Sequence, residues 1–154
     1  MKIGFASKII SPDIENQKQP LQLAGYAPRE LCSGIHDDIF ARFVYFEGDP
    51  DDISTHILIV CCDLISIPKD LGKLIKKKIS QKIPILIDHI MISATHTHHG
   101  TDFRGTFAPG SYTAIIKGFL FPIPNNRERF RWIKTMIQGA LEAFNNRENA
   151  SMAA

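Results

Sequence analysis

The sequence lacks any long hydrophobic run, since no stretch approaches the ~20 apolar residues that a membrane-spanning helix needs. Its opening residues, Met1 to Lys8, do not contain the apolar core of ~7–15 residues that marks a secretory signal peptide. The formal net charge is only +2, which does not provide the strongly basic field typical of nucleic-acid-binding domains. We therefore expect a soluble chain, cytoplasmic by default, with no nucleic-acid partner.

Cysteine is also scarce. Only Cys32, Cys61 and Cys62 are present, an odd number that cannot be fully paired in disulfides, and they form no C-x-x-C motif. Cys61 and Cys62 lie inside an apolar run, where a free cysteine behaves as a small buried hydrophobic residue. The cysteines therefore indicate neither a disulfide framework nor a metal site.

The 154 residues provide enough chain for one domain, and their hydrophobic pattern predicts an α/β fold. The apolar runs His56–Cys62 and His89–Ala94 have strand length, and between them lies a helical pattern over about Pro68–Ser80, for which Ser66 is the expected N-cap. This order predicts a βαβ unit with two parallel strands. Two further strands are expected at Ile3–Ile10 and Ile39–Phe46.

The last third of the chain is expected to hold a long loop and then a second helix. Residues 95–124 show no sustained period, and the aromatic-rich part Phe103–Phe121 is expected to pack against sequence outside these 154 residues or to be mobile. Asn125-x-x-Glu128 resembles a capping box. The expected apolar stripe of the helix is Phe130, Ile133, Ile137, Ala140, Leu141 and Phe144. We expect one domain over residues 1–147 and a polar tail over residues 148–154.

The chemistry is expected in the segment Thr95-His96-Thr97-His98-His99, which directly follows a predicted strand. Ligands of open α/β sheets bind beyond the carboxyl ends of the parallel strands. In extended backbone, residues i and i+2 share a side, so His96 and His98 can face one metal ion or divide metal and substrate between them. Thr95 and Thr97 are candidates for orienting the imidazoles, and His99 is expected to point away.

Other polar groups carry weaker signals. His56 and His89 begin strands, at the end opposite the expected site, and are interpreted as structural. His36, which precedes two aspartates, fits a solvated turn better than a ligand cluster. The basic residues of the first helix form a solvated face, with peripheral contact with a membrane as the alternative: Lys73, Lys76, Lys77 and Lys78.

Several motifs in order resemble the N-terminal part of the neutral/alkaline, non-lysosomal ceramidase family. They are Gly25-Tyr26-Ala27, Gly34-Ile35-His36, Ala41-Arg42, Asp63-Leu64 and Ala94-Thr95-His96-Thr97-His98. The resemblance runs from Ile3 to about Asn146 but covers only the opening portion of the family's catalytic domain. It implies an α/β fold, a mixed sheet with a parallel βαβ unit and flanking helices, as an incomplete N-terminal portion of that larger domain.

The resemblance further implies a zinc-dependent amidohydrolase of sphingolipid metabolism that cleaves the N-acyl amide bond of ceramide or a related lipid amide. By this resemblance His96 is a zinc ligand, and His98 is a catalytic residue that contacts the substrate or the oxyanion. The family's other ligands (a His, a Glu and a Tyr) come from later sequence, so the remainder of the catalytic domain is an implied partner and the fragment alone is expected to be inactive. Relatives are often secreted or membrane-associated. The residues His99-Gly100-Thr101-Asp102 depart from the sequence that usually follows the motif in this family. This departure bears on the lipid specificity implied by the resemblance more than on metal binding.

Two alternatives remain open at this point. The chain is either a different metallohydrolase with a His-x-His pair after a strand, or a non-catalytic remnant or interaction module of the same fold. Metallo-β-lactamases normally continue with Asp and then His, and His99-Gly100 does not match that pattern.

Overall fold

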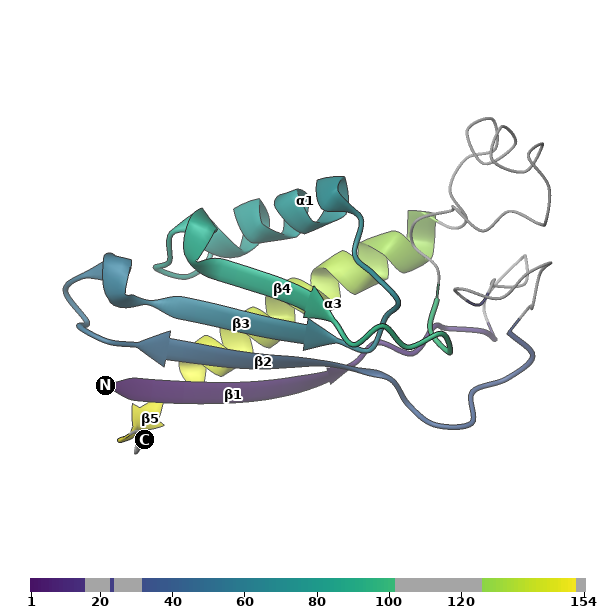
Figure 1. The fold of residues 1–154 in the computed structure, drawn as a ribbon, viewed down its shortest axis with the longest axis horizontal. Coiled ribbons are helices and arrows are strands. Elements are labelled where there is room, and N and C mark those ends of the chain that lie inside the picture. Colours follow the sequence, from purple (N-terminus) through teal and green to yellow (C-terminus); the bar gives the residue numbers. More distant parts are fainter. Residues whose placement is uncertain (16–22, 24–31, 102–125, 152–154) are drawn as a thin grey trace.

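A computed structural model describes residues 1–15, 23, 32–101 and 126–151. Five strands form one mixed sheet in the order β4-β3-β2-β1-β5 (Figure 1). The strands are β1 (Lys2–Ile9), β2 (Phe40–Glu47), β3 (Ile57–Cys62), β4 (Ile90–Ala94) and β5 (Glu148–Asn149). The described helices are α1 (Lys69–Ser80) and α3 (Asn126–Asn145), with 3₁₀ turns at Ile53–Thr55 and Ile87–His89. The expectations for Phe103–Phe121 and for a cap at Asn125 concern residues outside the described ranges.

The predicted βαβ unit is confirmed. β3 and β4 pair in parallel, from Leu58 opposite Ile90 to Cys62 opposite Ala94, and α1 connects them. β1 pairs antiparallel with β2, and β2 antiparallel with β3, so the sheet is mixed as expected. The four strands expected from the sequence begin and end within one residue of the observed bounds.

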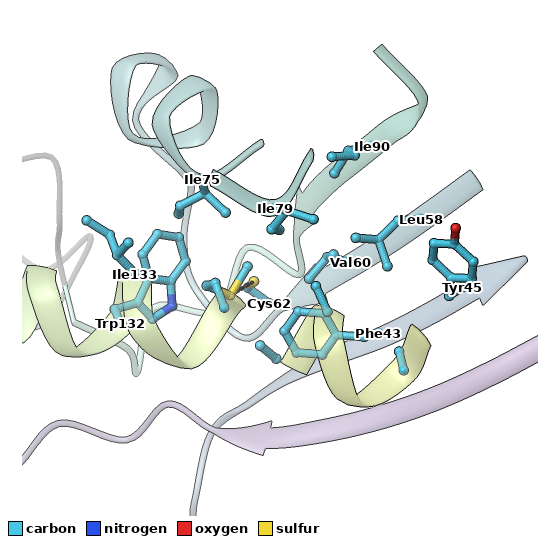
Figure 2. Close-up of a cluster of buried hydrophobic side chains, with 14 of the residues drawn as sticks. Phe43, Tyr45, Leu58, Val60, Cys62, Ile75, Ile79, Ile90, Trp132 and Ile133 are labelled. Carbon is cyan, nitrogen blue, oxygen red and sulfur yellow. Dashed lines mark hydrogen bonds between the residues drawn. The ribbon is translucent and has the colours of Figure 1, made fainter. Parts of the chain in front are cut away.

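Both helices pack on the same face of the sheet (Figure 1). Alternate residues of the central strands point into this layer, among them Phe43, Tyr45, Leu58 and Val60, which are all but fully buried (Figure 2). Burial of large apolar side chains contributes ~1.5–3 kcal/mol each, so this layer is the main source of stability. The side chains that meet them from the helices are Leu71, Ile75 and Ile79 of α1 and Trp132, Ile133, Met136, Ala140 and Ala143 of α3.

Two glycines allow α3 to lie close to the sheet. A Cβ atom at Gly4 of β1 would come within 1.9 Å of the carbonyl oxygen of Ala143. A Cβ atom at Gly139 would come within 2.3 Å of the ring of Phe43. Helix and strand therefore approach at a distance that no other residue type permits at these positions.

Two local predictions about the helices are wrong. The N-cap of α1 is Pro68, which has no side chain that can accept a hydrogen bond, so Ser66 does not cap the helix. Phe130 is 69% exposed, although it was expected on the buried stripe of α3. The stripe that meets the sheet is rotated toward Trp132, Met136 and Ala143, because Gly139 itself lies against the ring of Phe43.

The C-terminal segment takes part in the fold. Lys2 and Ile3 of β1 pair antiparallel with Asn149 and Glu148 of the expected polar tail, which form the short edge strand β5. The guanidinium of Arg147 lies 2.8 Å from the carboxylate of Glu47, whose side chain is only 6% exposed. This ion pair connects the segment that follows α3 to the last residue of β2, a central strand of the sheet.

Candidate functional site

The candidate site lies where β3 and β4 end. The last parallel pair is Cys62 opposite Ala94, and the chain continues from β4 into the histidine-rich segment. The amide N–H of Thr95 donates to the carbonyl of Cys62 at 2.9 Å, and that of His96 donates to the carbonyl of Leu64 at 3.0 Å. The segment is therefore held against the connection between β3 and α1, at the edge of the sheet where ligands of this architecture bind.

The backbone of His96 is left-handed, with a φ of 68°. Among non-glycine residues, His belongs to those that adopt this region more readily, at a cost of about 1 kcal/mol or more. The extended geometry therefore ends before the motif, and the strand alternation expected from the sequence does not operate here. The rings of His96 and His98 nevertheless lie together, with centroids 5.3 Å apart at an interplanar angle of 74°. The two rings are therefore adjacent, but the left-handed backbone of His96 brings them together instead of a pleated strand.

One backbone carbonyl determines which ring nitrogen of His96 carries the proton, that is, its tautomer. Its Nδ1 lies 2.8 Å from the carbonyl oxygen of Ile65, an atom that can only accept a hydrogen bond, so Nδ1 carries the proton in the neutral ring. The lone pair then resides on Nε2, which is the atom available to a metal ion. The exposed side chain of His96 thus has the tautomer of a zinc ligand.

Sequence reasoning assigned the orienting role to Thr95 and Thr97. For His96 it belongs to the carbonyl of Ile65, a main-chain atom that no side-chain pattern could have indicated. The hydroxyl of Thr97 instead accepts a hydrogen bond from the amide of His99 at 3.3 Å, which stabilises the turn.

The described part of the chain does not complete a metal centre. Among these residues, no three His, Cys, Asp or Glu side chains come together in an arrangement that could hold a metal ion. Asp63, at the end of β3, is engaged elsewhere: its carboxylate accepts hydrogen bonds from the guanidinium of Arg42, at 2.9 and 3.1 Å, and from the amide of Phe40 at 3.0 Å. Among the described residues at this edge, His96 and His98 are the candidate metal-binding side chains.

His99 lies at a different part of the surface, although the strand alternation on which its expected orientation rested does not hold here. It lines a hollow of about 560 Å³ together with Ser11, Asp38 and Thr101. His36 lies at the same hollow, almost fully exposed, with Nδ1 2.7 Å from the carboxylate of Asp37. This placement agrees with a solvated turn for the residues around His36.

The two histidines that begin strands are structural. His56 is 1% exposed, its Nε2 lies 2.9 Å from the carbonyl of Asp49, and its Nδ1 lies 2.9 Å from both the hydroxyl of Tyr45 and the carbonyl of Pro84. His89 contacts the carbonyl of His56 through Nδ1 at 3.1 Å. These contacts join β2, β3 and the turn before β4 at the end of the sheet far from His96.

The cysteines carry no disulfide. Cys62 is fully buried, and this burial raises the pKa of its thiol to about 12, so it is protonated and unreactive at neutral pH. Cys61, its neighbour in β3, is half-buried and points to the opposite face of the sheet.

Comparison with known proteins finds similarity at the level of the fold. No family model and no curated protein matches the sequence. Among the solved structures that match, two cover 96% of the chain. One is a ceramidase in complex with C2, with a TM-score of 0.72 and 18% identity; the other is the neutral ceramidase of Pseudomonas aeruginosa, with a TM-score of 0.66 and 17% identity. The match spans 21% and 22% of those chains, so this chain has the fold of about one fifth of a neutral ceramidase.

Proposed function

We propose that the chain supplies one part of the active site of a zinc-dependent amidohydrolase of the neutral ceramidase type. The observation that carries the proposal is the pair of adjacent imidazoles, His96 and His98, at the carboxyl edge of β3 and β4. The substrate would be the N-acyl amide bond of ceramide or of a related lipid amide, which places the protein in sphingolipid metabolism. The fold shared with two ceramidase structures supports this assignment.

In this proposal His96 would bind the metal through Nε2, while the carbonyl of Ile65 accepts the hydrogen bond from Nδ1 and orients the ring. Zinc, when bound there, would supply hydroxide at neutral pH and polarise the acyl carbonyl. His98, half-buried beside His96, would donate a hydrogen bond to the oxyanion that develops on the acyl oxygen when hydroxide adds to the acyl carbon. Such a donor typically contributes about 10²–10³ in rate.

A catalytic zinc site usually has three protein ligands and an open position for water. The described residues contribute His96, with His98 next to it, so further ligands must come from another part of the enzyme. We propose that they belong to the remainder of the catalytic domain, because the ceramidases matched here are about five times as long as the aligned segment. The 154 residues alone should therefore bind zinc weakly and should not hydrolyse amides.

Titration of the isolated chain with zinc tests the assignment, with the histidine ring protons observed by NMR. We expect zinc to perturb the rings of His96 and His98 at the lowest concentrations, while buried His56 serves as the internal control. The perturbation should disappear in His96→Ala. Equal perturbation of His36, or none at the motif, would instead support a non-catalytic remnant or interaction module.

We also propose that a basic surface between the helices contacts membrane lipids, consistent with a lipid substrate. Phe130, 69% exposed, and Leu74, 38% exposed, line a hollow of about 310 Å³ between α3 and α1, and Lys78 and Lys134 are also part of its lining. Lys73 and Lys77 of α1 are exposed as well. Apolar side chains bordered by lysines are typical of protein surfaces that lie on anionic bilayers. Within the described residues, no helix has the length and the apolar character to cross a bilayer.

A further inference from the structure

We propose that the face of the sheet opposite the helices is the surface on which the rest of the catalytic domain packs, through a second apolar layer. The inference rests on the proposed function for the identity of the partner, but the surface itself follows from the register of the strands. It concerns the side of β1 to β4 that points away from α1 and α3.

A continuous apolar row crosses four strands on this face. Phe5 of β1 pairs with Val44 of β2, Val44 pairs with Ile59 of β3, and Ile59 pairs with Met91 of β4. Phe5 is 63% exposed and Met91 is 52% exposed, at the two ends of the row. Cross-strand neighbours on one face lie about 4.5–5.5 Å apart, so these side chains form one patch.

A second row runs beside the first. Ile3 of β1 pairs with Phe46 of β2, which pairs with Ile57 of β3, and Ile57 is 45% exposed. A sheet with one solvated face normally alternates apolar and polar residues, whereas both faces of these strands are apolar. Contiguous exposed apolar rows of this kind mark an interaction surface.

One row of this face is polar, and it lies next to the candidate site. Ser7, Arg42, Cys61 and Ser93 form this row where β3 and β4 end, and beyond it Ile9 of β1, 51% exposed, pairs with Phe40 of β2. A layer that covers the apolar rows therefore ends beside this polar row and the histidine segment. It can deliver ligands toward His96 without burying Arg42, whose guanidinium is paired with Asp63.

The length of the ceramidase structures identifies the occupant. The match covers nearly this whole chain but leaves about four fifths of the ceramidase chain without a counterpart in the 154 residues. A sheet with helices on one face is two layers of a domain, and a third layer on its apolar face would turn the open surface into core. We therefore assign the face to this missing polypeptide and not to a second copy of the chain.

The exposure of the face can be tested on the isolated chain. We expect light scattering to show a monomer, and we expect this monomer to bind the dye ANS. The double substitution Phe5→Thr with Met91→Thr should remove most of the dye binding and change the melting temperature by no more than a few degrees. The control Phe130→Thr, on the helical side, should retain the dye bound by the sheet. A discrete dimer that the double substitution dissociates would assign the face to a second copy and overturn the proposal.

Cys61 provides a reporter for the occupant. In a Cys32→Ser background it is the thiol expected to react, because Cys62 is fully buried. The probe is Pseudomonas aeruginosa neutral ceramidase from which the segment aligned with this chain has been deleted. We expect saturating probe to slow alkylation of Cys61 at least about tenfold, and we expect Phe5→Lys to weaken the protection by a similar factor.

Phe130→Lys, the matched control, should leave the protection unchanged. Alkylation of Cys61 that is unaffected by saturating probe, or equally affected by both lysine substitutions, would overturn the proposal. His96→Ala should also leave docking intact, since docking requires neither zinc nor turnover. Loss of Cys61 protection would therefore contradict the docking surface, whereas loss of the zinc-dependent shifts would contradict the zinc assignment alone.

Discussion

The imidazole Nδ1 of His96 lies 2.8 Å from the carbonyl oxygen of Ile65, a residue 31 positions earlier in the chain. This hydrogen bond connects the segment after β4 to the loop between β3 and α1. It fixes the ring's tautomer and orientation before any metal is bound, so the geometry of the candidate ligand depends on that loop.

The left-handed backbone of His96 gives a test that separates its structural and chemical roles. Both His96→Ala and His96→Gly remove the imidazole, so both should abolish the zinc-dependent NMR shifts. Glycine adopts positive φ without a steric penalty, whereas alanine does not, so the glycine variant should be more stable by about 1 kcal/mol. Urea unfolding measures the difference; an alanine variant as stable as the glycine variant would show that the left-handed conformation relaxes.

His98 should behave differently from His96 once all ligands are present. In the complete catalytic domain, His96→Ala should remove zinc and activity together, because it deletes a ligand. His98→Ala should retain most of the zinc while lowering kcat about 10²–10³-fold, because its proposed contact is with the oxyanion. His99→Ala should have little effect on either. Metal content and single-turnover rates are the measurements, and equal zinc loss in the His96 and His98 variants would make both residues ligands.

Much of the fold could be predicted from the sequence because its signals are local. The runs Ile57–Cys62 and Ile90–Ala94 are apolar over their full length, and the helical pattern between them leaves few topologies. The orientation of α3 could not be predicted in the same way. Phe130 continues the apolar pattern, but the contacts of Gly139 with Phe43 and of Gly4 with Ala143 determine which side meets the sheet, and such contacts depend on tertiary packing.

The candidate site was predictable in position but not in conformation. The polar residues His96 and His98 directly follow an apolar strand, which is enough to place them at its carboxyl end. Their relative placement depends on the left-handed backbone of His96 and on a main-chain carbonyl at Ile65, and neither has a side-chain signature. Pairing of Glu148 with Ile3 was likewise invisible, because a two-residue strand has no period.

Gly4→Ala should destabilise the fold strongly. The new Cβ would lie 1.9 Å from the carbonyl oxygen of Ala143, so α3 or β1 must shift, and overpacking of this kind costs about 1–3 kcal/mol or more. Gly34→Ala is the matched control, because a Cβ there would meet no described atom within 4 Å. Thermal melts of the two variants should differ clearly, and a Gly4→Ala melt equal to that of the control would contradict the close packing of α3 on β1.

Arg147→Ala should show that the C-terminal segment belongs to the domain. It removes the partner 2.8 Å from the carboxylate of Glu47, which is 6% exposed. Breaking a buried ion pair costs about 3–5 kcal/mol when the remaining charge is left alone, and the cost here should be lower because Lys2 still pairs with Glu47. Lys2→Ala is the comparison: its ammonium lies 3.3 Å from the same carboxylate but is 46% exposed, so its loss should cost less than about 1 kcal/mol. Urea unfolding of both variants measures the contrast, and equal losses would contradict a structural role for Arg147.

Binding to vesicles should depend on the surface between α1 and α3. Vesicles of phosphatidylcholine with phosphatidylserine should sediment the chain at low salt, whereas pure phosphatidylcholine should not, because each lysine near an anionic surface contributes about 1 kcal/mol. Phe130→Ser and the pair Lys78→Gln with Lys134→Gln should each weaken sedimentation, since the first removes an exposed apolar group and the second removes charge beside it. Phe5→Ser is the matched control, because Phe5 is also exposed but lies on the opposite side of the molecule. If Phe5→Ser abolished sedimentation while Phe130→Ser did not, the lipid contact would belong to the open face of the sheet instead of the helices.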